Sequence, residues 1–562
     1  MLDLVRESPA GLFLNWASDG RVLPYPEQRP DFVPPANLLP PTRRPQASAG
    51  KLLSGESSPD AATLVDGEVV DKALKGEADV DRYPYLVEWA EGDPDNPQNW
   101  SFGRKLFVSI EICLLSLVFY IGSSVWTASQ PGIQEEFGVS PIVATLGLSL
   151  FVLGYGFGPM ILSPLQETPR IGRTSVYYAS FAAYLLLQAP ILASGNLGCI
   201  LFFRFVTGFV GSPAIATGVA SLSDMWGVLD MPYAVGSWSV FAVAGPILGP
   251  VIAGFAAQAK TWKWPLYELL WMCSVAFLIF TFLLPETFAA TLLLRRAARL
   301  RKVTGNPLLK TRTEIEAQFH PGVLQAGVNQ VGLAFRLCVE PAIAFCDLYT
   351  GVVYACFYLC VFTTFPIVFS EYHGFNLGVA ALPFLSFIVA GVPTFAAYVA
   401  YYKYRFNPRL VASNYKLPPE ANLELAFWGA PAIPLSLFVF GWTGNSPSTS
   451  YWGPIIGASL YFPGIFLVFQ CVLLYLATSY AKVSASVLGG NALFRATFAA
   501  ALPLAGRPFF HTLGVGPACS LLGGVSILLM IPLYFLWKKG DRLRARSKFA
   551  EHKAESPAVM AV

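Results

Sequence analysis

The feature that most constrains this chain is a series of apolar stretches, each about twenty residues long, that begins after Lys105. A helix rises about 1.5 Å per residue, so such a stretch crosses a ~30 Å hydrocarbon core. Lipid cannot hydrogen-bond an open backbone, so the spanning segments are expected to be helical. Twelve spans are predicted, at 105–126, 144–163, 174–194, 198–220, 233–256, 265–284, 341–370, 378–402, 423–441, 451–478, 485–505 and 517–537. The sequence therefore predicts an all-α integral membrane protein.

The composition supports this reading. Hydrophobic residues make up 54% of the chain and charged residues only 13%, against about 25% charged in ordinary soluble domains. The first hundred residues hold 9 basic and 17 acidic residues, although the whole chain has a net charge of +3. A soluble fold and nucleic-acid binding are therefore not expected.

Charge and length also divide the chain. Lys and Arg gather in the connections that would lie on one side of the membrane, which predicts that both termini are cytosolic. The 56-residue connection after the sixth span separates two groups of six. The expected parts are a disordered cytosolic tail (1–100), a six-helix bundle (101–284), a basic cytosolic linker (285–340), a second six-helix bundle (341–537) and a basic cytosolic tail (538–562).

Several functional classes lack their motifs. No G-x-x-x-x-G-K-[ST] phosphate loop is present, so ATP is not expected to be the energy source. The four histidines and nine cysteines are scattered, without the clusters that hold metals. We expect no enzyme activity, no metal and no cofactor. A carrier driven by an ion gradient remains.

Four charged residues lie well inside the predicted spans, Glu111, Arg204, Asp347 and Arg495, and Glu268 lies near the end of another. A charge at this depth is expensive unless it faces a cavity or a partner. Glu111 and Asp347 each lie six positions into the first predicted span of their half, so they are either symmetry-related proton carriers or helix-end carboxylates that reach water. An arginine keeps its proton in proteins, so Arg204 and Arg495 can assist proton coupling or bind an anion but cannot carry the proton.

The fifth predicted span has the spacing G-x8-G-P-x2-G-P. Proline kinks a membrane helix and glycine lets a neighbouring helix approach closely. A bend and a close helix contact are therefore expected together here. The residues of this motif are Gly236, Gly245, Pro246, Gly249, Pro250 and Gly254.

Several segments, in this order, resemble the major facilitator superfamily and, within it, the fungal twelve-span drug:proton antiporter branch. They are DPDNPQNW at 93–100, RFVTGFVGSP at 204–213, the glycine–proline motif of the fifth span, LPET at 284–287 and LRARSKFA at 543–550. The resemblance implies two six-helix bundles that alternate access to a shared site. It also implicates Arg204 in proton coupling and associates the fifth-span motif with export.

One signature of that superfamily is altered. After the second span the usual G-x-L-x-D-R-x-G-R appears as SPLQE at 163–167 followed by RIGR at 170–173. Glu167, Arg170 and Arg173 are the gating candidates. They are expected to form a tight loop in which a Glu167–Arg173 ion pair contributes both to structure and to locking one access state.

Aromatic residues make up 14% of the chain and many fall within the spans. Rings can hold planar or hydrophobic ligands by stacking and dispersion, although most membrane aromatics face lipid or other helices. The weak candidates for substrate contact are Tyr155, Trp238, Tyr354, Tyr358 and Phe494.

The leading hypothesis is proton-coupled export of hydrophobic or amphipathic small molecules, such as drugs, fungicides, toxins or secondary metabolites, across the plasma membrane. One alternative is a proton-coupled carrier for uptake or vacuolar storage of a defined metabolite such as a polyamine. An alternative of another class is a sensor or scaffold that transports nothing. The expected partners are a small-molecule substrate, protons and membrane lipids, with a monomer as the functional unit.

Overall fold

The computed structural model describes residues 2–34, 38–39, 83–316, 331–480, 483–545, 547 and 549–550. Within these residues, 12 helical segments are long and apolar enough to cross a membrane, as predicted. The first six are α4 with α5 (Phe102–Ser124, Trp126–Phe137), α6 (Pro141–Gln166), α7 (Arg173–Ala193), α8 with α9 (Leu197–Ala216, Gly218–Ser223), α10 (Met231–Ala259) and α11 (Trp264–Leu283).

The second six contain more breaks. They are α15 (Pro341–Leu359) with η5 and η6 (Cys360–Thr364, Pro366–Tyr372); α16 to α18 (Leu377–Ala381, Leu385–Tyr401, Asn407–Ala412) with η7 and η8 (Leu382–Phe384, Tyr402–Phe406); η9, α19 and α20 (Pro419–Leu423, Glu424–Gly429, Ala432–Thr443); α21 and α22 (Trp452–Ser459, Tyr461–Ser479); α23 (Ser484–Leu513); and α24 (Val515–Arg544).

Several helices extend beyond the predicted spans. The first span was expected to end at 126, but after a break at Val125 the chain continues as α5 to Phe137. Local signals explain some of the actual starts: the Ser140 hydroxyl accepts from Val143 N ahead of α6, and the Asn196 side chain accepts from Gly198 N ahead of α8. Hydropathy alone does not report such caps.

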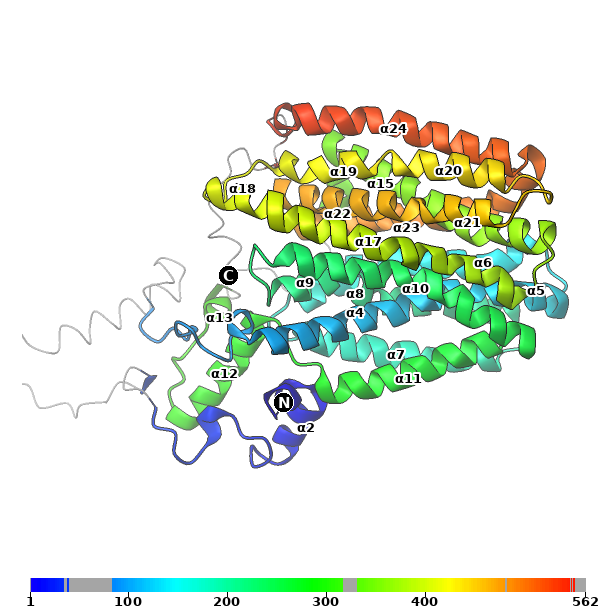
Figure 1. Ribbon diagram of the computed structural model, residues 1–562. Helices are drawn as coiled ribbons and strands as arrows, with labels where there is room; N and C mark the ends of the chain where they lie inside the picture. The colour runs from blue at the N-terminus through cyan, green and yellow to red at the C-terminus, as the bar shows by residue number, and fades with distance from the viewer. Residues whose placement is uncertain are drawn as a thin grey trace, which may run out of the picture.

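The helices form two bundles that lie side by side, one from α4 to α11 and one from α15 to α24 (Figure 1). In each bundle the first span packs on the fifth, α4 on α10 and α15 on α23. The bundles meet where α6 packs on α23 and where α10 packs on α16 and α17. We call the end that carries the linker helices α12 (Ala289–Thr304) and α13 (Arg312–Glu316) the linker end, and the other the opposite end.

The expectation of a disordered tail is wrong for two of its parts. Residues 2–28 form α1 (Leu2–Glu7), α2 (Pro9–Ala17) and η1 (Pro26–Gln28), which pack on α7, α11 and α12. Residues 83–100 are also placed, and Leu86 forms a parallel bridge with Lys310 of the linker. A hydropathy pattern does not predict that the tail packs on the linker, because ion pairs make many of the contacts between them. Arg296 of α12 contacts Glu27 at 2.9 Å and Asp93 at 2.5 Å. Most of the remaining tail, residues 40–82, lies outside the described residues.

The other expected boundaries differ less. The linker is helical at α12 and α13, and 317–330 lies outside the described residues. The predicted C-terminal tail (538–562) begins at a kink in α24, where the Lys539 backbone is not helical, and a short helical stretch then continues to Arg544. The Nε and Nη2 atoms of Arg544 each lie 2.8 Å from a carboxylate oxygen of Glu420.

Candidate functional site

Three tyrosines meet at the centre of the molecule, where the two bundles come together. Tyr155 belongs to α6 of the first bundle, whereas Tyr354 and Tyr358 lie one turn apart on α15 of the second. The Tyr155 hydroxyl oxygen is 3.0 Å from that of Tyr354 and 3.3 Å from that of Tyr358, and the last two are 3.3 Å apart. The Ser123 hydroxyl of α4 is 3.5 Å from Tyr358. This tyrosine cluster is a polar contact at membrane depth that neither bundle can make alone.

Arg495 lies beside the cluster. Its guanidinium carbon is 5.2 Å from the ring centre of Tyr354 and 5.0 Å from that of Phe469 on α22, within cation–π range. The side chain is half-buried. Phe494, the next residue, stacks on Phe498 and packs against Gly351 of α15. Of the five weak aromatic candidates, the structure thus brings three tyrosines together and places Phe494 on the adjacent helix face.

Trp238, the fifth candidate, lies elsewhere. Its indole nitrogen donates to the Ser116 hydroxyl at 2.8 Å, and that hydroxyl donates to Ala214 O at 2.6 Å. These contacts join α10, α4 and α8 inside the first bundle. Trp238 is therefore a packing residue of that bundle in this conformation.

Arg204 is fully buried and contacts no carboxylate within 4.0 Å among the described residues. Its Nε donates to Gly147 O at 3.0 Å, Nη1 to Gly122 O at 2.9 Å and Nη2 to Ser123 O at 3.4 Å. Gly122 and Ser123 lie in the last turn of α4, where carbonyls lack helical partners and carry partial negative charge. Arg204 thus fastens α8 to the break between α4 and α5.

The two buried carboxylates have different surroundings. Asp347 is fully buried, and its Oδ1 accepts from Asn491 Nδ2 at 2.8 Å; the same nitrogen is 2.9 Å from Thr350 Oγ1. Asp347 Oδ2 and both oxygens of Glu111 have no hydrogen-bond partner among the described residues. Asp347 lies six residues after the start of α15, whereas Glu111 lies nine residues after the start of α4. The two carboxylates therefore do not lie at the same distance from the starts of their helices, although the sequence predicted that they would.

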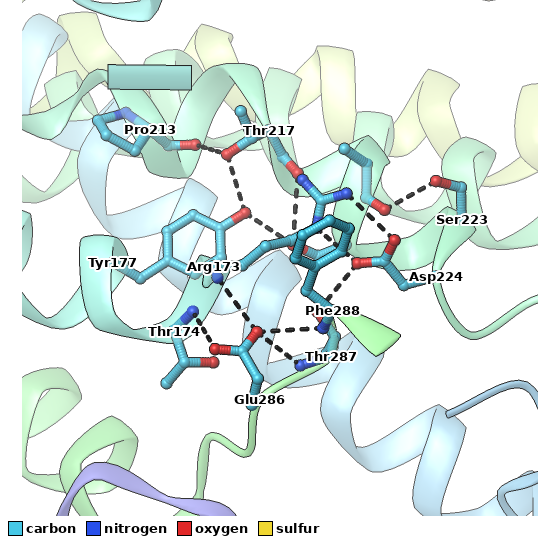
Figure 2. A network of polar contacts seen from close by, with 12 residues as sticks. Arg173, Thr174, Tyr177, Pro213, Thr217, Ser223, Asp224, Glu286, Thr287 and Phe288 are labelled. Atoms are coloured by element: carbon cyan, nitrogen blue, oxygen red, sulfur yellow. Dashed lines mark hydrogen bonds and ion pairs between the residues drawn. The ribbon is translucent and has the colours of Figure 1, made fainter. Parts of the chain in front are cut away.

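The gating candidates form a different ion pair from the one expected. Arg173 pairs with Asp224, which follows α9: Nε is 2.5 Å from Oδ2 and Nη2 is 3.1 Å from Oδ1 (Figure 2). No ion pair within 4.0 Å joins Arg173 to Glu167 in the described part of the chain, so that prediction is wrong. Glu167 and Arg170 are both exposed on the α6–α7 turn. No local pattern in the sequence predicts that Asp224 pairs with Arg173, because the two residues are fifty-one positions apart.

A second buried carboxylate completes this network. Glu286 of the LPET segment is fully buried, and its two oxygens accept from the backbone nitrogens of Arg173, Thr174, Thr287 and Phe288 at 3.1–3.3 Å (Figure 2). Burial raises the pKa of Glu286 and that of Asp224, while nearby arginines oppose the shift. The carboxylate caps α7 and fixes the start of the linker to the first bundle.

The glycines of the fifth span divide into two pairs. A Cβ on Gly245 would meet Tyr120 and Leu117 of α4, and one on Gly249 would meet Ser124, so the inner pair lets α10 approach α4. A Cβ on Gly236 would lie 2.6 Å from the Tyr398 ring, and one on Gly254 would lie 2.7 Å from Leu377 O. The outer pair therefore sets the contact of α10 with the second bundle, at the linker end and the opposite end respectively. Pro246 and Pro250 lie inside the continuous helix α10.

Known proteins share this architecture. The chain matches the family model of the Major Facilitator Superfamily over residues 112–503, well over half its length. The chain belongs to the major facilitator superfamily. The predicted family and fold are therefore confirmed, and the protein is a multi-pass membrane transporter of small molecules.

Two fungal relatives are similar to this chain in sequence, and one solved structure is similar in fold. Transporter mfs1 of Schizosaccharomyces pombe is 41% identical over 474 residues, 83% of this chain and 88% of that protein. The cycloheximide resistance protein of Candida maltosa is 33% identical over 568 residues, 98% of this chain and 100% of that protein. The xylose symporter XylE of E. coli has the same fold, with a TM-score of 0.54 and 13% identity over 78% of this chain and 96% of its own.

Proposed function

We propose that this transporter exports hydrophobic or amphipathic small molecules across the plasma membrane in exchange for protons. It acts as a monomer with the linker end and both termini in the cytosol. The observation that carries the proposal is the tyrosine cluster with Arg495, an aromatic and polar site to which both bundles contribute. Rings and a few convergent polar groups are what a site for small, largely apolar ligands needs.

Two further observations support export. A relative that aligns with nearly the whole chain is named for resistance to cycloheximide, a property that outward transport of a toxic compound provides. The basic residues also concentrate in the linker, at Arg295, Arg296, Arg299 and Arg301, which by the positive-inside rule supports a cytosolic linker end and so the orientation that export requires.

Asp347 and Glu111 are the proposed proton carriers. Both are buried at membrane depth, and only a carboxylate among the four intramembrane charges can gain and lose a proton. Asp347 is the stronger candidate because Asn491 fixes one of its oxygens and the only other side-chain partner among the described residues is the weak thiol donor of Cys338. Arg204, with all three nitrogens bonded to backbone carbonyls, supports this role by holding the first bundle in shape.

The test is transport in a pump-deficient yeast expressing this chain. Export should stop with a protonophore and persist after ATP depletion while a pH gradient is maintained. Asp347→Asn and Glu111→Gln should reach the membrane in wild-type amounts yet fail to concentrate cargo against its gradient. Full gradient-driven export by both variants would exclude these carboxylates. In inside-out vesicles an exporter carries cargo from the medium into the lumen, so net movement from the lumen to the medium would exclude the proposed direction.

A further inference from the structure

We propose that Arg495 is a cargo-binding residue, and that the central site selects uncharged planar compounds that carry a hydrogen-bond acceptor. The guanidinium donates to the acceptor while the rings of Tyr354 and Phe469 lie against the planar body. This inference rests on the proposed function and names the class of compound that the same site takes.

The first argument is the unused hydrogen-bonding capacity of Arg495. A guanidinium has five N–H donors, and at membrane depth each needs an acceptor or water. The guanidinium of Arg204 donates hydrogen bonds to three backbone carbonyls. Arg495 makes no hydrogen bond and no ion pair within 4.0 Å with any described residue, and its recorded neighbours are the two ring faces. The half-buried side chain therefore offers donors in a place where a bound molecule can use them.

The second argument is position. The Tyr354 ring that lies under Arg495 also carries the hydroxyl that contacts Tyr155 of the other bundle. Arg495 thus lies where α15, α22 and α23 converge on α6. When the bundles separate, the hydroxyls of Tyr354 and Tyr358 lose Tyr155 as a partner and become further donors and acceptors next to the guanidinium.

The third argument is charge. No carboxylate lies within 4.0 Å of Arg495 among the described residues, and Asp347 is occupied by Asn491, one turn earlier on α23. A polyamine or other cation would meet a fixed positive charge that no carboxylate in contact compensates, which is unfavourable at low dielectric. The site therefore discriminates against polycations, the cargo of one alternative carrier.

The same charge argues against anionic cargo. Asn491, which holds Asp347, lies one turn before Arg495 on α23, so an anion on Arg495 would bring a second negative charge near the proposed proton carrier. A second negative charge favours protonation of a carboxylate, and reciprocal linkage would make cargo and proton bind together. That is the coupling of a symporter. An uncharged acceptor leaves the charge of Arg495 in place and is compatible with exchange.

The test uses three planar probes of similar size in the pump-deficient host. They are 9-fluorenone, which has a carbonyl acceptor; fluorene, which lacks it; and 9-aminoacridine, a cation. The wild type should lower cellular fluorenone several-fold more than the other two. Arg495→Gln should abolish that preference and export fluorenone no better than fluorene, because the hydrogen bond from a charged group is lost. Arg507→Gln, at an exposed pair with Glu371, is the matched control and should behave as wild type.

Binding to purified protein gives a second readout that does not depend on transport. Fluorenone should raise the melting temperature of the wild type and of Arg507→Gln but not of Arg495→Lys, which keeps the charge and loses the planar fork. Equal export of fluorene and fluorenone, or full fluorenone binding by Arg495→Lys, would overturn the inference and leave the proposed function intact. No export of any probe or drug by the wild type would overturn both.

Discussion

Arg204 shows how a single buried charge can be structural as well as functional. Its three nitrogens reach carbonyls on α4 and α6, and its guanidinium lies over the rings of Trp126 and Phe151, at 5.0 and 4.5 Å. We predict that Arg204→Ala lowers the free energy of unfolding by about 3 kcal/mol or more, because buried carbonyls lose their partner. Denaturation of detergent-purified protein measures this change.

The control for this prediction is a surface arginine. Arg507→Ala removes an exposed ion pair with Glu371 (2.9 Å) and should change stability by about 0–1 kcal/mol. Equal stability of the Arg204→Ala and Arg507→Ala proteins would mean that the carbonyl contacts of Arg204 contribute nothing. Arg204→Lys should fall between them, since one ammonium cannot reach all three carbonyls.

Glu286 gives a prediction for pH. Burial raises its pKa above the ordinary value of 4.5, so the folded protein holds this proton over a range in which the unfolded chain has lost it. The stabilisation is full below pH 4.5 and is lost as pH rises through the raised pKa. Between pH 4.5 and neutrality, wild-type stability should therefore fall relative to Glu286→Gln, measured by melting temperature. Glu316→Gln, at an exposed linker position, should keep the wild-type profile.

At the scale of helices, apolar length was sufficient to predict the spans and their number, because a bilayer demands about twenty apolar residues per crossing. Contacts between distant segments were not predictable in the same way. The partner of Arg173 proved to be Asp224, and Asn491 on α23 holds Asp347 on α15. Neither pair leaves a periodic signal in the sequence, because each depends on which helix faces meet in the fold.

Helix α10 yields a prediction from its glycines. Gly236→Val should push α10 from Tyr398 and open the linker end, whereas Gly254→Val should push it from Leu377 and open the opposite end. Gly245→Val crowds α4 within one bundle, so it should lower stability without favouring either opening. Labelling of single cysteines, introduced at half-buried Phe395 beside Gly236 and at buried Ala381 beside Gly254 in a cysteine-free background, distinguishes the three outcomes. The same labelling pattern in all three variants would contradict the division of the motif.

At the scale of the whole molecule, the bundles are joined at both ends along α10. At the linker end, Tyr398 Oη donates to Pro232 O at 3.1 Å, and Asn407 Nδ2 contacts Leu229 O at 3.0 Å and Tyr233 Oη at 3.2 Å. At the opposite end, Gly378 N donates to Gln258 Oε1 at 3.0 Å. The Arg173–Asp224 pair lies within one bundle, so it cannot itself lock the two together. It instead helps to hold the 224–230 loop, in which the Leu229 carbonyl accepts a hydrogen bond from Asn407.

This arrangement predicts how access is biased. Removing the linker-end contacts with Tyr398→Phe and Asn407→Ala should weaken that closure by about 2 kcal/mol, or about 30-fold in population, because net hydrogen bonds contribute about 0.5–1.5 kcal/mol each. Cysteine labelling at Phe395 should rise and labelling at Ala381 should fall. Gln258→Ala should do the reverse, since one access state gains what the other loses. If both cysteines became more reactive in either variant, the bundles would be loosening as a whole, and two bundles alternating about a shared centre would not describe this transporter.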